Sequence, residues 1–146
     1  TYSLHPIIRF EMEKDWFEGK TKTDDFREIW NAKYQECFGM TPKDDRGGVL
    51  QDIHWASGHV GYFQSYTLGN LYGGQLLAAM RKKMPDWDDK LRTGDFAPIN
   101  QWLYENVHQY GRALTPKELI VKATGQPLSE QYFLDYLREK YLKKLW

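Results

Sequence analysis

The spacing of hydrophobic residues predicts helices along most of the chain. From Leu4 to Glu18, apolar residues recur every three or four positions, which is the period of one helix face. Pro6 fits this helix only in the first turn, because deeper in a helix proline removes a hydrogen bond and clashes with the preceding turn. Gly19 supplies the stop signal.

The same period predicts further helices downstream. The clearest start signal is Thr115-Pro116-Lys117-Glu118, a capping box with proline at the first helical position. The expected segments run from Thr23 or Asp24 to Phe38, from Tyr62 or Ser65 to Met84, from a cap at Asp95 to Tyr110, from Thr115 to Ala123, and from a cap at Ser129 with an apolar stripe that reaches Leu145. Residues 86–93 are expected as a short helix or an irregular turn. The fold class is therefore all-α, an irregular bundle of about six helices with one glycine-rich active-site loop.

One stretch of the chain concentrates polar chemistry. An acid, an imidazole, amides and phenols are grouped around glycines in Gly48-Val49-Leu50-Gln51-Asp52-Ile53-His54-Trp55 and in Gly61-Tyr62-Phe63-Gln64-Ser65-Tyr66-Thr67-Leu68-Gly69-Asn70-Leu71-Tyr72. Glycine allows the backbone to approach a ligand closely or to adopt positive φ. We interpret this stretch as half of an active site. The costly glycines within the predicted 62–84 helix, Gly69, Gly73 and Gly74, indicate close packing or a ligand.

Composition narrows the class of protein. A length of 146 residues predicts one helical domain, residues 1–146. Lys+Arg and Asp+Glu both number 20 and the basic residues are dispersed, which argues against nucleic acid as a partner. No apolar run has the length of a membrane span, and the single cysteine, Cys37, fits a reducing compartment, so we expect a cytoplasmic protein.

The pattern Gly-x-x-Gln-Asp-x-His-Trp, followed by Gly-Tyr-Phe-x-x-Tyr-Thr-Leu-Gly-Asn, resembles the carboxypeptidase Taq family, also called thermostable carboxypeptidase 1. The resemblance implies an all-helical zinc peptidase that releases single residues from peptide C-termini, and it covers Tyr2 to Trp146 as the C-terminal part of a longer protein. The family's His-Glu-x-x-His helix and its glutamate ligand would lie upstream of Thr1. We therefore expect Zn²⁺ to be bound by residues outside this chain and the chain alone to be inactive.

The resemblance makes His54 and Tyr66 the candidate catalytic residues. An imidazole and a phenol can both donate hydrogen bonds to a developing oxyanion. Without the surrounding motif, a histidine beside a tryptophan is more often structural, and an isolated tyrosine is more often a packing residue. No metal ligands are assigned within the chain, although His54 and His59 could form a weak surface site.

Four further residues are candidates for substrate binding: Gln51, Asp52, Tyr62 and Arg9. Asp52 could fix the tautomer of the imidazole two residues away or could equally cap the turn. Arg9 could form a bidentate pair with a substrate carboxylate, whereas an ion pair with Glu13 is the safer expectation.

Three hypotheses follow for the chain as a whole. The first is the C-terminal, substrate-binding part of a zinc metallocarboxypeptidase, with peptides and the upstream part of the same protein as partners and a homodimer left open. The second is a non-catalytic helical module that binds a protein or peptide through exposed aromatic residues. The third is a degenerate enzyme that retains affinity for peptide C-termini without cleaving them.

Overall fold

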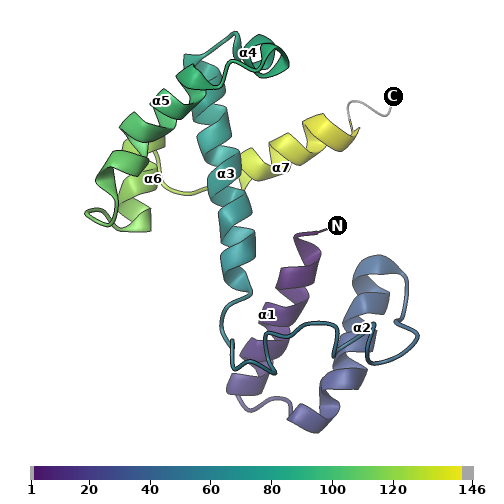
Figure 1. Cartoon of the computed structure of the whole chain (residues 1–146). Helices are drawn as coiled ribbons and strands as arrows, with labels where there is room; N and C mark the ends of the chain where they lie inside the picture. Colours follow the sequence, from purple (N-terminus) through teal and green to yellow (C-terminus); the bar gives the residue numbers. More distant parts are fainter. Residues whose placement is uncertain (1, 143–146) are drawn as a thin grey trace. The chain divides into compact units, whose positions relative to one another are not determined.

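The structure is a computed structural model that describes residues 2–142, and these residues form α-helices with no strand among them (Figure 1). The helices are α1 (Leu4–Phe17), α2 (Phe26–Phe38), α3 (Gln64–Lys83), α4 (Trp87–Thr93), α5 (Ala97–Asn106), α6 (Pro116–Thr124) and α7 (Gln131–Leu137). Short turns of 3-10 helix precede α2 (Thr23–Asp25) and follow α5 (His108–Tyr110), and a π-helical turn (Arg138–Leu142) follows α7. The all-α prediction is confirmed, and none of the described helices combines the length and apolar character needed to cross a membrane.

The described chain divides into two compact units, Thr1–Leu68 and Gly69–Trp146. The first contains α1, α2, the long loop over residues 39–63 and the first turn of α3. The second contains the rest of α3 and the helices that follow it. The single-domain expectation for residues 1–146 stays a prediction.

Most helix boundaries agree with the sequence signals, and the exceptions concern caps. The Thr115 hydroxyl accepts from the Glu118 N–H at 3.3 Å and the Glu118 carboxylate accepts from the Thr115 N–H at 2.8 Å, so the capping box is confirmed. The predicted cap at Asp95 is wrong, because α5 starts after Phe96 without a side-chain cap. The cap expected from Thr23 or Asp24 is also wrong, since a 3-10 turn occupies these residues.

The end of the last helix was predicted less well. The Ser129 hydroxyl does accept the Gln131 N–H, at 3.3 Å, although α7 formally starts one residue later than a cap at Ser129 would place it. The regular α-helix stops at Leu137 and continues as the π-helical turn. The predicted contribution of Leu145 lies outside the described residues.

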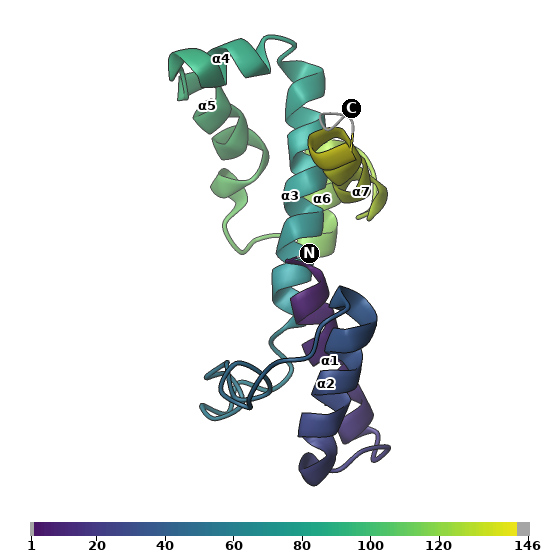
Figure 2. The ribbon, with the colours of Figure 1, turned by 90° about the vertical axis from the view of Figure 1, so that its right-hand side faces the viewer.

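The first unit has a small core between α1 and α2, which lie side by side in Figures 1 and 2. Ile8 and Met12 from α1 meet Trp30 and Tyr34 from α2, and all four are buried. The loop residue Trp55 packs against this cluster. The loop therefore completes the core of the first unit even though it contains no regular helix or strand.

Helix α1 does not bury the face that its hydrophobic residues predict. Arg9 and Glu13 are only 4% and 3% exposed, whereas Phe17 is 69% exposed and Phe10 is also on the surface. Leu4, Ile7 and Trp16 are likewise exposed. Two charged side chains thus lie inside the unit while large apolar side chains of the same helix face outward.

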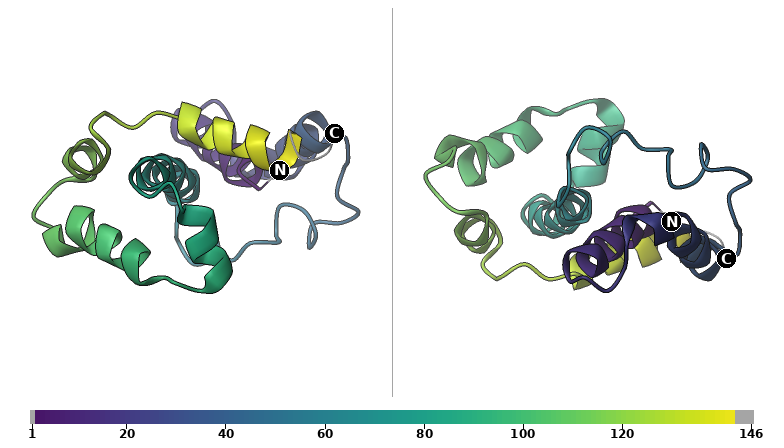
Figure 3. Two further views of the ribbon diagram at one scale, coloured as in Figure 1. Left: turned by 90° about the horizontal axis from the view of Figure 1, so that it is seen from above. Right: turned by 90° about the horizontal axis from the view of Figure 1, so that it is seen from below.

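The second unit is built around α3, and Figure 3 shows α4, α5, α6 and α7 arranged about it. Met80, Trp87 and Ile99 form its main buried cluster. Gly74 touches the backbone of Phe133 so closely that a Cβ would lie 2.9 Å from the Phe133 Cα. Close packing is therefore confirmed at Gly74, whereas a Cβ at Gly69 or Gly73 would meet no atom within 4 Å apart from its chain neighbours and the adjacent backbone of α3.

Gln75 joins α3 to the segment between α6 and α7. Its side chain is 1% exposed, and its Nε2 lies within hydrogen-bond distance of the Thr124 hydroxyl and the carbonyl oxygens of Gln126 and Pro127, at 2.9–3.2 Å. Its Oε1 accepts the Ser129 N–H at 2.9 Å. One buried amide thus satisfies several backbone groups that no helix supplies with partners.

We expect Gln75→Ala to lower the free energy of unfolding by about 1–3 kcal/mol, because it removes the hydrogen bonds of a buried amide and leaves the half-buried Ser129 N–H without its acceptor. Urea denaturation followed by circular dichroism measures this change. Gln101→Ala is the matched control, since Gln101 is exposed and bonds only to Glu105, and it should change stability by less than about 0.5 kcal/mol. Equal effects of the two substitutions would contradict the assigned role of Gln75.

Candidate active site

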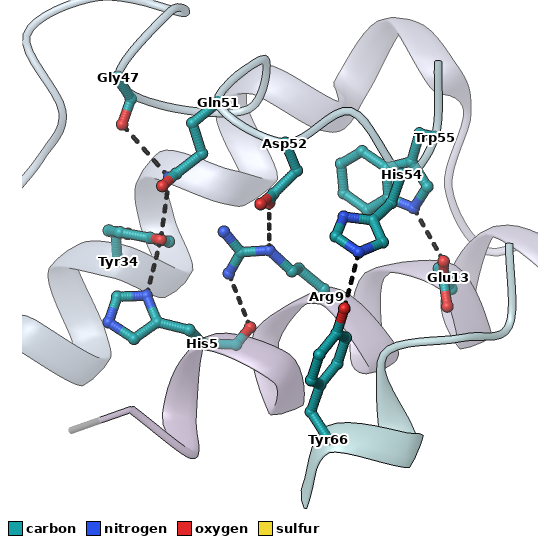
Figure 4. Close-up of polar contacts among 10 residues, drawn as sticks. All are labelled: His5, Arg9, Glu13, Tyr34, Gly47, Gln51, Asp52, His54, Trp55 and Tyr66. Atoms are coloured by element: carbon teal, nitrogen blue, oxygen red, sulfur yellow. Dashed lines mark hydrogen bonds and ion pairs between the residues drawn. The ribbon is translucent and has the colours of Figure 1, made fainter. Parts of the chain in front are cut away.

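Arg9 holds one end of the loop. Its Nε donates to Asp52 Oδ2 at 2.5 Å and its Nη1 donates to the carbonyl oxygen of His5 at 2.8 Å. The guanidinium also lies over the Trp30 ring, 4.4 Å from the ring centroid. A buried cation that is paired, hydrogen-bonded and stacked avoids the penalty of an isolated buried charge. Asp52 is thereby fixed against α1 (Figure 4).

Glu13, one helical turn after Arg9, holds the other end of the loop. Its two carboxylate oxygens accept from the Trp55 indole N–H at 2.8 Å and from the Gly61 N–H at 3.1 Å. Gly61 has a φ of +73°, a conformation that glycine adopts at little cost. Residues 52–61 are therefore anchored at both ends to one face of α1.

These contacts correct two expectations. Arg9 pairs with Asp52, and the predicted ion pair between Arg9 and Glu13 is wrong. Asp52 makes its ion pair with Arg9, while the Nδ1 atom of His54 has no hydrogen-bond partner among the described residues. Asp52 therefore does not fix the His54 tautomer.

His54 and Tyr66 are hydrogen-bonded to each other. The distance between His54 Nε2 and the Tyr66 hydroxyl oxygen is 3.0 Å, and Figure 4 shows the two side chains meeting between the loop and the start of α3. The Tyr62 ring lies beside both, with centroids 6.0 Å from His54 and 5.4 Å from Tyr66. The structure thus brings together the three ring residues that the sequence selected.

The surroundings of His54 favour one tautomer. Its Nδ1 is buried without a described partner. A proton on Nδ1 would be an unsatisfied buried donor, which costs about 1–3 kcal/mol, and buried N–H groups without partners are rarer than buried acceptors without them. The proton therefore belongs on Nε2, which donates to the Tyr66 oxygen. The hydroxyl hydrogen of Tyr66 is then available to another acceptor.

Tyr66 remains a protonated donor over the ordinary pH range. Partial burial raises its pKa above the usual value for tyrosine, and the neighbouring Tyr62 adds to the shift. Deprotonation of the Tyr66 hydroxyl therefore occurs at higher pH than for a free phenol, and its hydrogen stays available for donation at neutral pH.

A cavity of about 280 Å³ adjoins these residues. It is lined by Tyr2, His5, Pro6, Arg9, Gln51, Asp52, His54, Phe63 and Tyr66. Five of the six candidate site residues are in this lining, and the sixth, Tyr62, is an exposed ring beside it. His54 is half-buried and borders an open space rather than being sealed in the core.

Two residues of the site were missed by sequence reasoning. His5 lines the cavity, and Glu13 supports the loop. Their spacing with Arg9 was a usable signal, because residues 5, 9 and 13 recur every four positions and so share one helix face. That face also contains the buried Ile8 and Met12, which indicates that the charges point inward.

No metal site is formed by the described residues. Within residues 2–142, no three His, Cys, Asp or Glu side chains are grouped so that they could hold a metal ion. The rings of His54 and His59 are 6.4 Å apart, and no third ligand joins them. The described residues therefore do not fit the zinc that the family resemblance implies.

The fold and the cavity define an α-helical chain with an open cavity that is lined by hydrogen-bonding side chains. The family model described as Carboxypeptidase Taq (M32) metallopeptidase matches residues 1–141. The chain belongs to this family.

Relatives of known sequence and structure agree with this assignment. The chain is 47% identical over 141 residues to Carboxypeptidase 1 of Bacillus subtilis (strain 168) and 39% identical over 142 residues to Thermostable carboxypeptidase 1 of Pyrococcus furiosus. Each match covers 97% of this chain and 28% of the relative. The crystal structure of the M32 carboxypeptidase from Deinococcus radiodurans R1 matches with a TM-score of 0.93 and 41% identity, over 97% of this chain and 29% of that one. The chain thus spans less than a third of the length of the relatives it matches, in their C-terminal part.

The role of Glu13 can be tested directly. Glu13→Gln replaces one acceptor oxygen with an NH₂ group, which then faces the Trp55 N–H or the Gly61 N–H, and we expect a loss of about 1–3 kcal/mol in unfolding free energy. Amide hydrogen exchange over residues 50–62 should accelerate, since the loop loses an anchor. Glu11→Gln is the control: Glu11 is exposed and pairs with Lys33 at 2.6 Å, so its loss should cost less than about 1 kcal/mol and leave loop exchange unchanged. Unaltered loop exchange in Glu13→Gln would refute the anchoring role.

Proposed function

We propose that this chain is the substrate-binding part of a zinc metallocarboxypeptidase that releases single residues from the C-termini of peptides. The observation that carries the proposal is the hydrogen bond between His54 and Tyr66 at the edge of a polar cavity. Membership of the M32 family supports it, as do the names of the relatives, Carboxypeptidase 1 and Thermostable carboxypeptidase 1.

Tyr66 is the proposed oxyanion donor. Its hydroxyl accepts from His54 Nε2, so its own hydrogen can point to the carbonyl oxygen of the peptide bond that is to be cleaved. A fixed donor stabilises negative charge that develops on that oxygen and needs no reorganisation during the reaction. His54 holds the phenol in position and, in this arrangement, acts on the peptide through Tyr66.

The remaining candidates are proposed to bind the peptide. Arg9 Nε donates to Asp52 and Nη1 donates to the His5 carbonyl oxygen, while Nη2 makes no hydrogen bond to any described residue. This nitrogen is available to a peptide carboxylate, and Asp52 keeps the guanidinium oriented. Gln51 lines the same cavity, and the exposed Tyr62 ring offers a flat apolar surface for a neighbouring residue of the peptide.

The zinc of such an enzyme would be held by residues other than those described, because these residues offer no ligand group. The proposed work of this chain is therefore binding, orientation and hydrogen-bond donation. The lone Cys37, which is exposed and free, fits the reducing cytoplasm as the place of function.

The outward-facing hydrophobic residues support a protein partner as well. Phe10 and Phe17 on α1 and Leu50 and Ile53 in the loop are exposed, Ile53 by 76%. Exposed large apolar side chains mark an interaction surface where they form a continuous patch. We propose that further sequence of a metallocarboxypeptidase covers them, since the relatives extend far beyond the matched part. A second copy of the chain and an unrelated protein, as for a non-catalytic binding module, are the alternative occupants.

Peptide binding tests the assignment of Tyr66. In titrations of the chain with an N-acetylated dipeptide that has a free C-terminus, Tyr66→Phe should weaken binding about tenfold, as the loss of one hydrogen bond predicts. Tyr104→Phe is the control, because Tyr104 is an exposed tyrosine of the second unit, and it should leave the affinity unchanged. Equal affinity of Tyr66→Phe and the unmodified chain would contradict the role of this hydroxyl.

A second measurement concerns the metal. Because the described residues hold no ligand group, the 146-residue chain with added Zn²⁺ should not hydrolyse the same blocked dipeptide. Release of free amino acid is followed by chromatography, with a zinc carboxypeptidase as the positive control. Steady turnover that a chelator abolishes would contradict the proposal that the zinc is held by residues other than those described.

A further inference from the structure

His5 lines the cavity from the first turn of α1, although no sequence motif selected it. It is half-buried, and its ring stacks on Phe38 with 4.5 Å between centroids. Its Nδ1 lies 3.0 Å from the Tyr34 hydroxyl oxygen. The Nε2 atom makes no hydrogen bond to any described residue. The direction of the hydrogen bond at Nδ1 therefore decides what His5 offers to a ligand.

Gln51 settles the direction of that bond. Its side-chain nitrogen lies 3.3 Å from the Gly47 carbonyl oxygen and 3.2 Å from the Tyr34 hydroxyl oxygen (Figure 4). A carbonyl oxygen only accepts hydrogen bonds, so the NH₂ group of the amide must face Gly47. The second hydrogen of this group then points to Tyr34, whose oxygen acts as the acceptor. The hydroxyl hydrogen of Tyr34 is left to donate to His5.

The tautomer of His5 follows from this chain of bonds. If Tyr34 donates to Nδ1, then Nδ1 is unprotonated and the hydrogen of the neutral ring is on Nε2. The opposite assignment would leave the hydroxyl hydrogen of the buried Tyr34 without a described acceptor. Burial lowers the pKa of His5 and the nearby Arg9 guanidinium lowers it further, which agrees with a neutral ring.

We propose that His5 is a further substrate-binding residue, which Tyr34 and Gln51 orient so that its Nε2–H donates to an oxygen of the C-terminal residue of a bound peptide. This inference rests on the proposed function, because it takes its ligand from it. It assigns Gln51 a specific task, which is to orient His5 through Tyr34 as well as to line the cavity.

The chemistry of the cavity favours a carboxylate as the acceptor. Arg9 and Asp52 neutralise each other, so the wall contributes donors without a strong net charge. With the Tyr66 hydroxyl assigned to the carbonyl oxygen of the peptide bond, His5 Nε2–H and Arg9 Nη2 are the donors that remain. A carboxylate has only acceptor sites, and several donors can bind it at once.

Two variants of His5 separate substrate binding from a purely structural role. The side-chain nitrogen of His5→Gln can occupy the place of Nε2 and donate into the cavity, but the variant loses the acceptor for Tyr34. His5→Asn places an oxygen near Nδ1 and keeps the acceptor, but it loses the donor. We expect His5→Asn to weaken binding of the N-acetylated dipeptide about tenfold and His5→Gln to weaken it less than about threefold.

The tautomer itself is measured on the unmodified chain by ¹⁵N NMR of the histidine side chains, and this needs no variant to fold. We expect an Nε2-protonated His5, and a loss of the single tautomer in Tyr34→Phe. An Nδ1-protonated ring, or a larger loss of peptide affinity in His5→Gln than in His5→Asn, would overturn the proposal, as would equal affinities in both variants.

If the unmodified chain binds no dipeptide, the proposed function fails and this inference fails with it. Binding that His5→Asn leaves intact would defeat the inference alone.

Discussion

The conformation of the loop over residues 52–61 depends on two buried side chains of opposite charge on one face of α1. Arg9 and Glu13 are four residues apart, so their side chains leave the helix in the same direction. Burying either ion without a partner would cost several kcal/mol, and the loop supplies the partners: Asp52 for Arg9, and the N–H groups of Trp55 and Gly61 for Glu13. Separation of the loop from α1 would therefore leave both buried charges without partners. This constraint orders a segment that has no helix or strand of its own.

His54 lies between these two anchors, which explains how an irregular loop can position it. The imidazole is fixed by its neighbours in the loop on one side and by Tyr66 on the other. Tyr66 belongs to the first turn of α3, so a regular helix sets the position of the phenol. The hydrogen bond between His54 and Tyr66 thus joins one side chain from a helix and one from a segment that is anchored at two points.

The fold was predictable from local signals, whereas the site was predictable only in part. Periodicity and the Thr115–Glu118 capping box located most helices because these signals act within a few residues. The predicted partner of Arg9 was wrong because the local i,i+4 pair with Glu13 was preferred. The actual partner, Asp52, is 43 residues away. The buried face of α1 was predicted wrongly for a related reason. Hydrophobic periodicity assumes that apolar residues face the core of the same unit, whereas Arg9 and Glu13 are buried here. His54, Tyr66 and Tyr62 were selected because they lie in one continuous motif that resembles the family, whereas His5 was missed because it lies far from that motif in the sequence and the loop brings it to the site.

The two histidines of the cavity reach the same tautomer by opposite routes. His5 Nδ1 lies 3.0 Å from the Tyr34 hydroxyl oxygen and His54 Nε2 lies 3.0 Å from the Tyr66 hydroxyl oxygen. From the neighbouring groups we infer that His5 accepts from its phenol and that His54 donates to its phenol. In each case one hydrogen remains for a ligand, on His5 Nε2 and on the Tyr66 oxygen. With the Arg9 charge balanced by Asp52, discrimination then rests on hydrogen-bond direction more than on net attraction. In the proposed function, a C-terminal amide would bring its own N–H₂ group against His5 Nε2–H and Arg9 Nη2 and leave hydrogens unpaired, while a free carboxylate would accept from both. Under that proposal, a preference for a free C-terminus would follow from the direction of these two hydrogen bonds.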